Sequence, residues 1–202
     1  MRKELFAVVF ALCFGNVFAQ QYSYEMWHEG KLVLESGDTL RGLLKYDIQQ
    51  DLLQYNDQKK VTEAFTPRKV LYFEIFDQTV NRYRHFFSLP YAASGYYKTP
   101  VFFELMVEGK ITLLVREALE YRTFSSPYFY GSYTRLVLVD KFFFMDEKAN
   151  IKEFQGKKGD LLSQFGKYAN DVDRYIKINK LKVEDRYDLA KVISYYNSLF
   201  IR

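Results

Sequence analysis

Cysteine is nearly absent from this chain. The single cysteine among its 202 residues is Cys13, which lies in an N-terminal segment that we expect to be removed. A mature chain without it can form no disulfide, no thiol nucleophile and no thiolate metal site. Small secreted domains that depend on disulfides are therefore excluded, and the fold must rest on an apolar core. Hydrophobic residues make up 49% of the chain and aromatic residues 19%, which supplies that core.

Histidine and the common catalytic motifs are also scarce. His28 and His85 are the only histidines; they lie far apart in sequence, so we expect no metal site and no cofactor. The sequence contains no Gly-x-Ser-x-Gly, Gly-x-Gly-x-x-Gly or P-loop pattern, which leaves nucleotide binding and serine hydrolase chemistry without a motif. The net charge of +4 is scattered, so we expect no nucleic-acid partner.

Long apolar runs are limited to the N-terminus. Arg2 and Lys3 precede an apolar run from Leu5 to Phe14, and the segment ends in Val17-Phe18-Ala19. A membrane span needs about 20 apolar residues, so this pattern predicts a signal peptide over residues 1–19, cleaved between Ala19 and Gln20. A retained anchor is the alternative. We expect an exported protein of the periplasm, cell surface or extracellular space, with no transmembrane span after cleavage. Leu12 stands where the lipobox of bacterial lipoproteins has a small residue, so lipidation of Cys13 is not expected.

Residues 20–155 carry the pattern of a β-rich domain. Gly30–Asp47 alternates apolar and polar residues around Ser36-Gly37-Asp38, which predicts a hairpin. Val101–Glu117 predicts a second hairpin, in which a two-residue turn at Glu108-Gly109 would pair Glu104 with Leu113. Further strand-like runs are Leu52–Tyr55, Lys59–Phe65, Val70–Phe76, Val80–Phe87, Leu136–Met145 and Ile151–Phe154. We expect a mainly antiparallel sheet of about eight or nine strands, curled or partly closed.

Residues 156–202 change from strand to helix periodicity. Asp160 is placed to cap a helix, and apolar residues follow it at three- and four-residue spacing through Ile176. A second apolar stripe runs from Leu189 to Phe200. The pattern predicts a C-terminal helical hairpin packed on the sheet, and the fold class is therefore α+β.

Three stretches carry a resemblance. They are Gly37–Tyr46, Glu108–Glu117, and the ending made of Tyr175–Lys182 with Tyr195–Leu199. Together they resemble a group of uncharacterised exported proteins of Bacteroidota. The resemblance implies a cell-envelope or secreted location and the order of strands followed by helices, and it implies no activity and no functional residues.

Aromatic residues gather in two segments that we expect to be loops, residues 91–100 and 121–133. Exposed aromatic side chains bury a large area at little rotamer cost, so they are common anchors for proteins and sugars. The alternative is that they fold back and cap the sheet. The candidate contact residues are Tyr96, Tyr97, Tyr121, Phe124, Tyr128, Phe129, Tyr130 and Tyr133.

Charged residues give two further hypotheses. Glu74, Glu104 and Glu117 lie on apolar strands, where two facing carboxyls could serve a glycosidase-like hydrolase; the alternative is that they are solvent-exposed or paired with Arg84, Arg116 or a tyrosine. The basic residues of the helices could touch an anionic membrane surface, although acidic residues interleave with them; they are Lys167, Arg174, Lys177, Lys180, Lys182 and Lys191. We favour a non-enzymatic envelope protein that binds a protein or glycan, or has a structural role, over the hydrolase.

Overall fold

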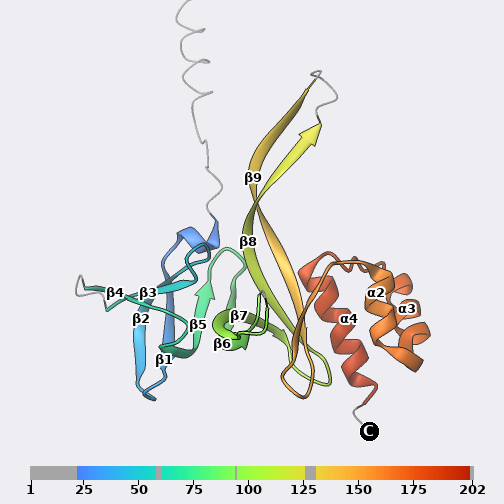
Figure 1. Ribbon diagram of the computed structural model, residues 1–202, viewed down its shortest axis with the longest axis horizontal. Coiled ribbons are helices and arrows are strands. Elements are labelled where there is room, and N and C mark those ends of the chain that lie inside the picture. Colours follow the sequence, from blue (N-terminus) through green and yellow to red (C-terminus); the bar gives the residue numbers. More distant parts are fainter. Residues whose placement is uncertain (1–21, 58–60, 94, 126–130, 201–202) are drawn as a thin grey trace, which may run out of the picture.

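One open antiparallel sheet dominates the structure. The computed structural model describes residues 22–57, 61–93, 95–125 and 131–200. Within these residues ten strands form a single sheet in the order β10-β9-β8-β7-β6-β5-β1-β2-β3-β4, followed by three α-helices (Figure 1). The α+β class and the antiparallel sheet are confirmed, with slightly more strands than expected. The two outermost strands, β10 and β4, do not meet, so the sheet is not closed.

Most strands pair with their neighbours in sequence; the exception is that β5 pairs with β1 instead of β4, which leaves β4 at the edge of the sheet. The first five strands are β1 (His28–Leu34), β2 (Thr39–Asp47), β3 (Leu52–Asn56), β4 (Thr62–Phe65) and β5 (Val70–Asp77). The next five are β6 (Arg82–Tyr91), β7 (Thr99–Val107), β8 (Thr112–Ser125), β9 (Ser132–Met145) and β10 (Ile151–Phe154). The helices are η1 (Ser23–Glu25), α2 (Lys158–Gln164), η2 (Gly166–Tyr168), α3 (Ala169–Ile178) and α4 (Arg186–Ser198).

The hairpin of β1 and β2 forms as the sequence predicts. Gly37 has φ 91° in its turn, a left-handed conformation that glycine adopts without strain. Gly30 and Gly42 face each other across the two strands. A Cβ at Gly30 would lie 2.2 Å from the carbonyl oxygen of Glu74, and one at Gly42 would lie 2.5 Å from that of Asn56. Both glycines are therefore required by close backbone approach.

Two apolar clusters share one face of the sheet. The first, here the N-terminal core, is built around Leu32, Leu44, Phe73 and Phe102. The second, the helix-side core, joins the far ends of β8 and β9 to the helices. Its fully or almost fully buried members are Leu113, Val115, Phe142, Leu161, Phe165, Val172, Ile176, Leu189, Val192 and Ile193. Because the helices cover the β8 and β9 residues of the helix-side core, removal of the helices would expose these apolar strand ends to water.

The C-terminal region contains three helices where a hairpin of two was expected. The first predicted helix is interrupted at Gly166, whose φ of 52° is left-handed, and it continues through η2 into α3. Asp160 lies within the first turn of α2, so its predicted N-cap role is wrong. The residue that caps α4 is Asp185, whose side chain accepts hydrogen bonds from the backbone N–H groups of Tyr187 and Asp188, each at 3.0 Å. None of the helices in the described ranges is long and apolar enough to cross a membrane.

The β7–β8 connection is wider than the predicted two-residue turn. Val107 pairs with Leu113, and Glu104 pairs with Val115 instead of Leu113. Asn197 of α4 explains the difference, because its side chain accepts from the Ile111 N–H at 3.0 Å and donates to the Ile111 carbonyl at 2.9 Å. The helix thus fixes the turn. Because Val115 and Glu117 are two residues apart on β8, Glu104 lies on the same face as Glu117.

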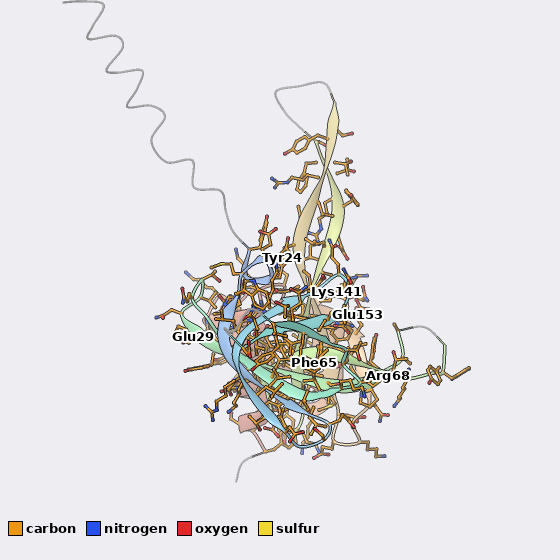
Figure 2. The ribbon with its side chains drawn as sticks, turned by 90° about the vertical axis from the view of Figure 1, so that its left-hand side faces the viewer. Tyr24, Glu29, Phe65, Arg68, Lys141 and Glu153 are labelled. Carbon is orange, nitrogen blue, oxygen red and sulfur yellow. The ribbon has the colours of Figure 1, made fainter. Side chains whose placement is uncertain are left out.

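The strands β8 and β9 extend well beyond the rest of the sheet. β7 pairs with β8 only as far as Val115, and β10 pairs with β9 only from Phe142 onward. We call the remaining two-stranded part, residues 118–125 and 132–139, the arm. It projects from the body of the molecule in Figures 1 and 2. The predicted loop over residues 121–133 is therefore wrong for Tyr121–Ser125 and Ser132–Tyr133, which are paired strand residues.

Candidate functional site

Three of the aromatic candidates lie on the arm. Tyr121 and Phe124 belong to β8 and Tyr133 belongs to β9. Phe124 pairs with Tyr133, and their rings stack with centroids 5.7 Å apart. The guanidinium of Arg135 lies 4.7 Å from the Phe124 ring. Tyr121 pairs with Leu136, three positions along β8 from Phe124, and so points to the opposite face of the ribbon. Tyr128, Phe129 and Tyr130 fall outside the described residues.

The other aromatic candidates lie elsewhere. Tyr96 and Tyr97 are fully or largely exposed in the β6–β7 connection. Tyr91, at the start of this connection, packs edge-on against Phe143 with centroids 5.4 Å apart. Along β9, Phe143 is roughly 33 Å from Tyr133 at the rise of a strand. The structure therefore separates the candidates into two groups instead of one platform.

A charged stripe crosses the sheet between the two apolar cores. Residues that pair across antiparallel strands share a face, and the pairing runs from Phe86 through Glu104 to Val115. On each of three strands, a carboxylate separates a residue of the N-terminal core from one of the helix-side core. The three series are Phe102–Glu104–Met106 on β7, Leu119–Glu117–Val115 on β8 and Leu138–Asp140–Phe142 on β9.

Arg84 of β6 is the centre of this stripe and is 5% exposed. Its Nε and Nη2 donate to the two carboxylate oxygens of Glu104 at 3.1 and 2.7 Å. Nη2 also donates to Glu117 at 2.7 Å, and Nη1 donates to Asp77 at 3.1 Å. A planar guanidinium suits this arrangement because its N–H donors diverge in one plane. One arginine thereby neutralises carboxylates from three different strands.

Arg186 of α4 approaches the stripe from the helices. It donates to Glu104 and to Glu117, the latter at 2.9 Å, and lies 3.4 Å from Asp140. Arg82 reaches Glu104 at 3.5 Å and stacks over Tyr187. Removing one partner of such a buried set leaves uncompensated charge, which costs more than the intact pair contributes. The stripe therefore joins α4 to the sheet through charge as well as through apolar packing.

The pKa values of these carboxyls differ with their partners. Burial opposes the ionisation of Asp77, but hydrogen bonds from Ser23, Thr79 and Arg84 outweigh it and lower its pKa to about 2. Burial acts in the same direction on Glu104, where the charges of Arg84 and Arg186 lower the pKa. Asp140 is the opposite case: burial, with the nearby charge of Glu117, raises its pKa despite Arg186. Ionised Asp77 and Glu104 thus stabilise the fold near neutral pH.

Ser23, His28 and Asp77 lie together but do not form a catalytic triad. Ser23 Oγ donates to Asp77 Oδ2 at 2.5 Å. His28 Nε2 lies 2.8 Å from the Ser23 carbonyl oxygen, to which it must donate, and 3.3 Å from Ser23 Oγ. A histidine that donates from this nitrogen cannot also accept the serine proton there. The contacts instead attach η1, near the predicted mature N-terminus, to the charged stripe.

The carboxyls do not form the open pair that the hydrolase hypothesis requires. Glu74 lies on the opposite face of the sheet from Glu104, because it neighbours Phe73, and it pairs with Lys31 at 3.1 Å. Glu104 and Glu117 are held by arginines, which is the alternative that the sequence left open for them. Asp140 is more exposed, but Glu120 on the same arm base points to the other face and is bound by Lys141 at 2.9 Å.

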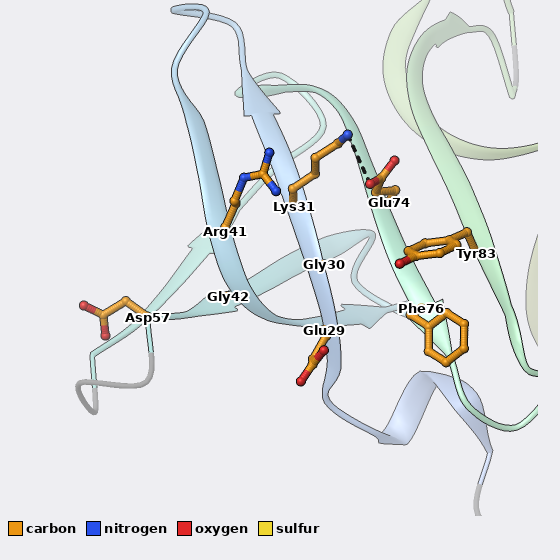
Figure 3. Close-up of a pocket in the computed structure, with 9 residues that line it drawn as sticks. All are labelled: Glu29, Gly30, Lys31, Arg41, Gly42, Asp57, Glu74, Phe76 and Tyr83. Atoms are coloured by element: carbon orange, nitrogen blue, oxygen red, sulfur yellow. Dashed lines mark ion pairs between the residues drawn. The ribbon is translucent and has the colours of Figure 1, made fainter.

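A hollow of about 560 Å³ lies on the outer face of β1, β2, β5 and β6. Figure 3 shows Lys31 and Arg41 on one side of it, Glu29 on the other, and Gly30 and Gly42 between them. Tyr83, which is 61% exposed, forms a further wall. Most of the lining residues are charged, and one of the carboxylates, that of Glu74, forms an ion pair with Lys31. This hollow resembles a solvated polar surface more than a reaction site.

The basic helix residues are partly neutralised on their own helices. Lys177 pairs with Asp173 at 2.6 Å and Lys191 with Asp188 at 2.8 Å. Over the part of the chain that the structure describes, no cluster of three His, Cys, Asp or Glu residues could hold a metal ion. The acidic–basic alternation on these helices is typical of a solvated face.

Sequence reasoning missed Asp77, Asp140 and Arg186. A signal for the strand residues was available: a charged residue that lies two positions from buried apolar residues shares their face of the sheet. Arg84 before Phe86 and Asp140 before Phe142 are examples. The comparisons add no candidate, because no family model, curated protein or solved structure matches the chain.

Proposed function

We propose that this protein is an exported cell-envelope protein that binds a partner protein through the arm and performs no catalysis. The observation that carries the proposal is the exposure of large side chains on a two-stranded ribbon that leaves the body of the molecule. Tyr121 is 78%, Tyr133 52% and Leu136 42% exposed. Aromatic side chains in such positions are typical anchors of protein interfaces. The proposed location rests on the signal peptide that the sequence predicts over residues 1–19.

The mounting of the arm supports a binding role. Its two strands continue directly into the charged stripe and the helix-side core, where Val115 is 1% and Phe142 4% exposed. Leu119 and Leu138 at its base pack against the N-terminal core. A ribbon fixed at its base loses less conformational entropy on binding than a free loop does. The arm is therefore a preorganised binding element.

Site-specific photocrosslinking tests the proposal. A photoreactive amino acid replaces Tyr133 on the arm and, as a matched control, Tyr83 on the outer face of β6, which is at least as exposed. We expect a protein adduct from position 133 in native envelope fractions and none from position 83. Purified parent chain should compete for the adduct, and the Tyr121→Ser/Leu136→Ser variant should not, although its melting temperature should stay within about 2 °C.

The outcomes separate the alternatives. Equal adducts from both positions, or none from either, would contradict binding through the arm. An adduct whose mass shift survives exhaustive proteolysis and is removed by glycosidases would replace the partner protein with a glycan. A Tyr121→Ser/Leu136→Ser variant that melts much earlier would show that these residues support the fold instead.

A further inference from the structure

The outer edge of β9 is free beside the end of β10. β10 pairs with β9 only between Phe142 and Met145, and after Phe154 the chain leaves the sheet for α2. Among the described strands, none pairs with β9 on this side over residues 132–141. Leu136–Val139 is a run of four apolar residues, and β9 contains no proline. Natural proteins usually block such an edge with charges, proline or a covering segment, because unpaired N–H and C=O groups attract another strand.

A hollow of about 510 Å³ lies along this free edge. Its lining includes the consecutive β9 residues Leu138, Val139, Asp140, Lys141 and Phe142. Successive residues of a strand point to opposite faces, and all five border the hollow, so it reaches the edge of β9. Glu120 and Arg122 of β8 also line it, so it extends over the face that carries Val139 and Lys141 as well. The end of β10, from Glu153 to Gly156, closes it on one side. Lys141 and Glu153 mark its place at the base of the arm in Figure 2.

The charges around the hollow indicate the kind of segment it accepts. Glu120 is bound by Lys141 at 2.9 Å, and Asp140 lies 3.4 Å from Arg186. Glu153 and Glu184 also line the hollow and are exposed. Within the described part of the chain, neither has an ion-pair partner closer than 4 Å. Arg122 also lines the hollow, 3.7 Å from Glu120, so four carboxylates face two cations in the lining and its net charge is negative.

We infer that the β9 edge binds an extended segment of the partner protein as an additional strand, with basic side chains that face Glu153 and Glu184. The added strand continues the line of β10 toward the arm. Main-chain hydrogen bonds to β9 supply affinity, and the two glutamates select for basic sequence. The inference rests on the proposed function, because it names how the partner continues from the arm onto its base.

A defined peptide probe tests this inference with purified full-length protein. The probe is a fluorescent decapeptide of alternating valine and lysine. Its controls are the valine and glutamate version and a valine and lysine version with alternate backbone nitrogens methylated, which removes donors without removing charge. We expect anisotropy to report binding of the first peptide only, and hydrogen exchange to slow at residues 137–141 of β9.

Charge reversals at and away from the edge provide the matched variants. Glu153→Lys/Glu184→Lys should weaken peptide binding at least tenfold. Glu35→Lys/Glu63→Lys changes the net charge equally at exposed positions on β1–β4 and should weaken it less than twofold. Melting curves of both variants should match the parent, which separates lost binding from lost folding.

Several results would overturn the inference. Equal binding of the N-methylated peptide would show attraction by charge alone. Protection of β4, the other edge of the sheet, would place the added strand elsewhere, and self-association of the parent chain that protects β9 would give the edge to a second copy. Any of these results, combined with a retained crosslink from position 133, removes the edge site and leaves the proposed function standing. Loss of the crosslink from position 133 with retained peptide binding would contradict the proposed function and leave the edge site as a binding site for an extended segment.

Discussion

The two halves of the β8–β9 hairpin have the same strands but opposite environments. At the base, Leu113 and Leu114 of β8 and Phe142 and Phe143 of β9 are almost fully buried. In the arm, Tyr121 and Leu136 form a cross-strand pair of the same kind and are largely exposed. The difference comes from the neighbours: β7, β10 and the helices cover the base, and no described strand covers the arm. Strand pattern alone therefore fixes the direction of a side chain but not its burial.

The charges of the two halves differ in the same way. At the base, Glu117 is shared by Arg84 and Arg186 and is shielded from water. In the arm, Arg122 pairs directly with Arg135 across the strands, an arrangement of like charges that is unfavourable without an anionic neighbour. Arg122 gains only a 3.7 Å contact with Glu120. The base uses its charges to position elements, whereas, among the described residues, Arg122 and Arg135 of the arm make only a 3.7 Å contact with Glu120 and a contact with the Phe124 ring.

Arg84→Met should have the largest effect on stability. It removes the central cation of the charged stripe: Glu104 and Glu117 keep Arg186, but Asp77 loses its ion pair. Breaking a buried set of charges in this way costs about 3–5 kcal/mol. The matched arm variant, Arg135→Met, removes one contact with an aromatic ring and should cost less than about 1 kcal/mol. Urea denaturation of both variants measures the difference.

Arg84→Lys is a control that separates the loss of charge from a general failure to fold. It keeps the charge but loses the two-point contact with Glu104, so an intermediate cost is expected. Equal midpoints for Arg84→Met and Arg135→Met would show that the base charges carry no more stability than those of the arm.

The pH dependence of stability should come mainly from the buried carboxyls of the charged stripe and less from the exposed arm. The folded-state pKa of Asp77 is lowered to about 2 from 3.8, and that of Glu104 is also lowered. Their stabilisation is present above the unfolded pKa, near 4, and is lost as the pH falls toward 2. Asp77 alone accounts for about 2 kcal/mol of this loss. Asp140, with a raised pKa, works in the opposite direction, because its protonation on acidification relieves a buried charge.

Asp77→Asn separates this contribution from general acid denaturation. The variant should be about 2 kcal/mol less stable than the parent at pH 7, and the difference should shrink as the pH falls from 4 to 2 and disappear only below the folded-state pKa of about 2. Chemical denaturation at several pH values provides the measurement, with exposed Glu35→Gln as the control. Parallel curves for parent and Asp77→Asn would contradict the assignment of the effect to this carboxyl.

Patterns among neighbouring residues predicted those elements whose structure depends on residues close together in the sequence. The β1–β2 hairpin follows from alternation and from Gly37, and the helical segment follows from its apolar spacing. The pairing of Glu104 and Glu117 with arginine was one of the alternatives from the sequence, but the part of Arg186 in the charged stripe could not be predicted, because its contact with Glu104 joins residues 82 positions apart. The β7–β8 register likewise depends on Asn197, 86 positions from Ile111. The extension of the arm was missed for another reason: serine, glycine and proline near its tip favour a loop, and they outweighed the strand-forming residues beside them.

The smallest effect should follow substitution within the arm. Thr123 and Thr134 pair across the strands, with their hydroxyl oxygens 2.9 Å apart and both residues exposed. Thr123→Ala removes this hydrogen bond where water can replace it, so the free energy of unfolding should change by less than about 0.5 kcal/mol.

Native-state hydrogen exchange can measure the effect of Thr123→Ala separately in the arm and in the base of the β8–β9 hairpin. Amides of the arm can open without unfolding the body, because they lack the apolar contacts of Leu113–Val115, so they should exchange at a much lower opening free energy than the base. Thr123→Ala should speed exchange only in the arm and leave Leu113–Val115 unchanged. Equal acceleration in both halves would mean that the hairpin unfolds as one unit, and the arm would then be a part of the scaffold instead of an independently adjustable binding element.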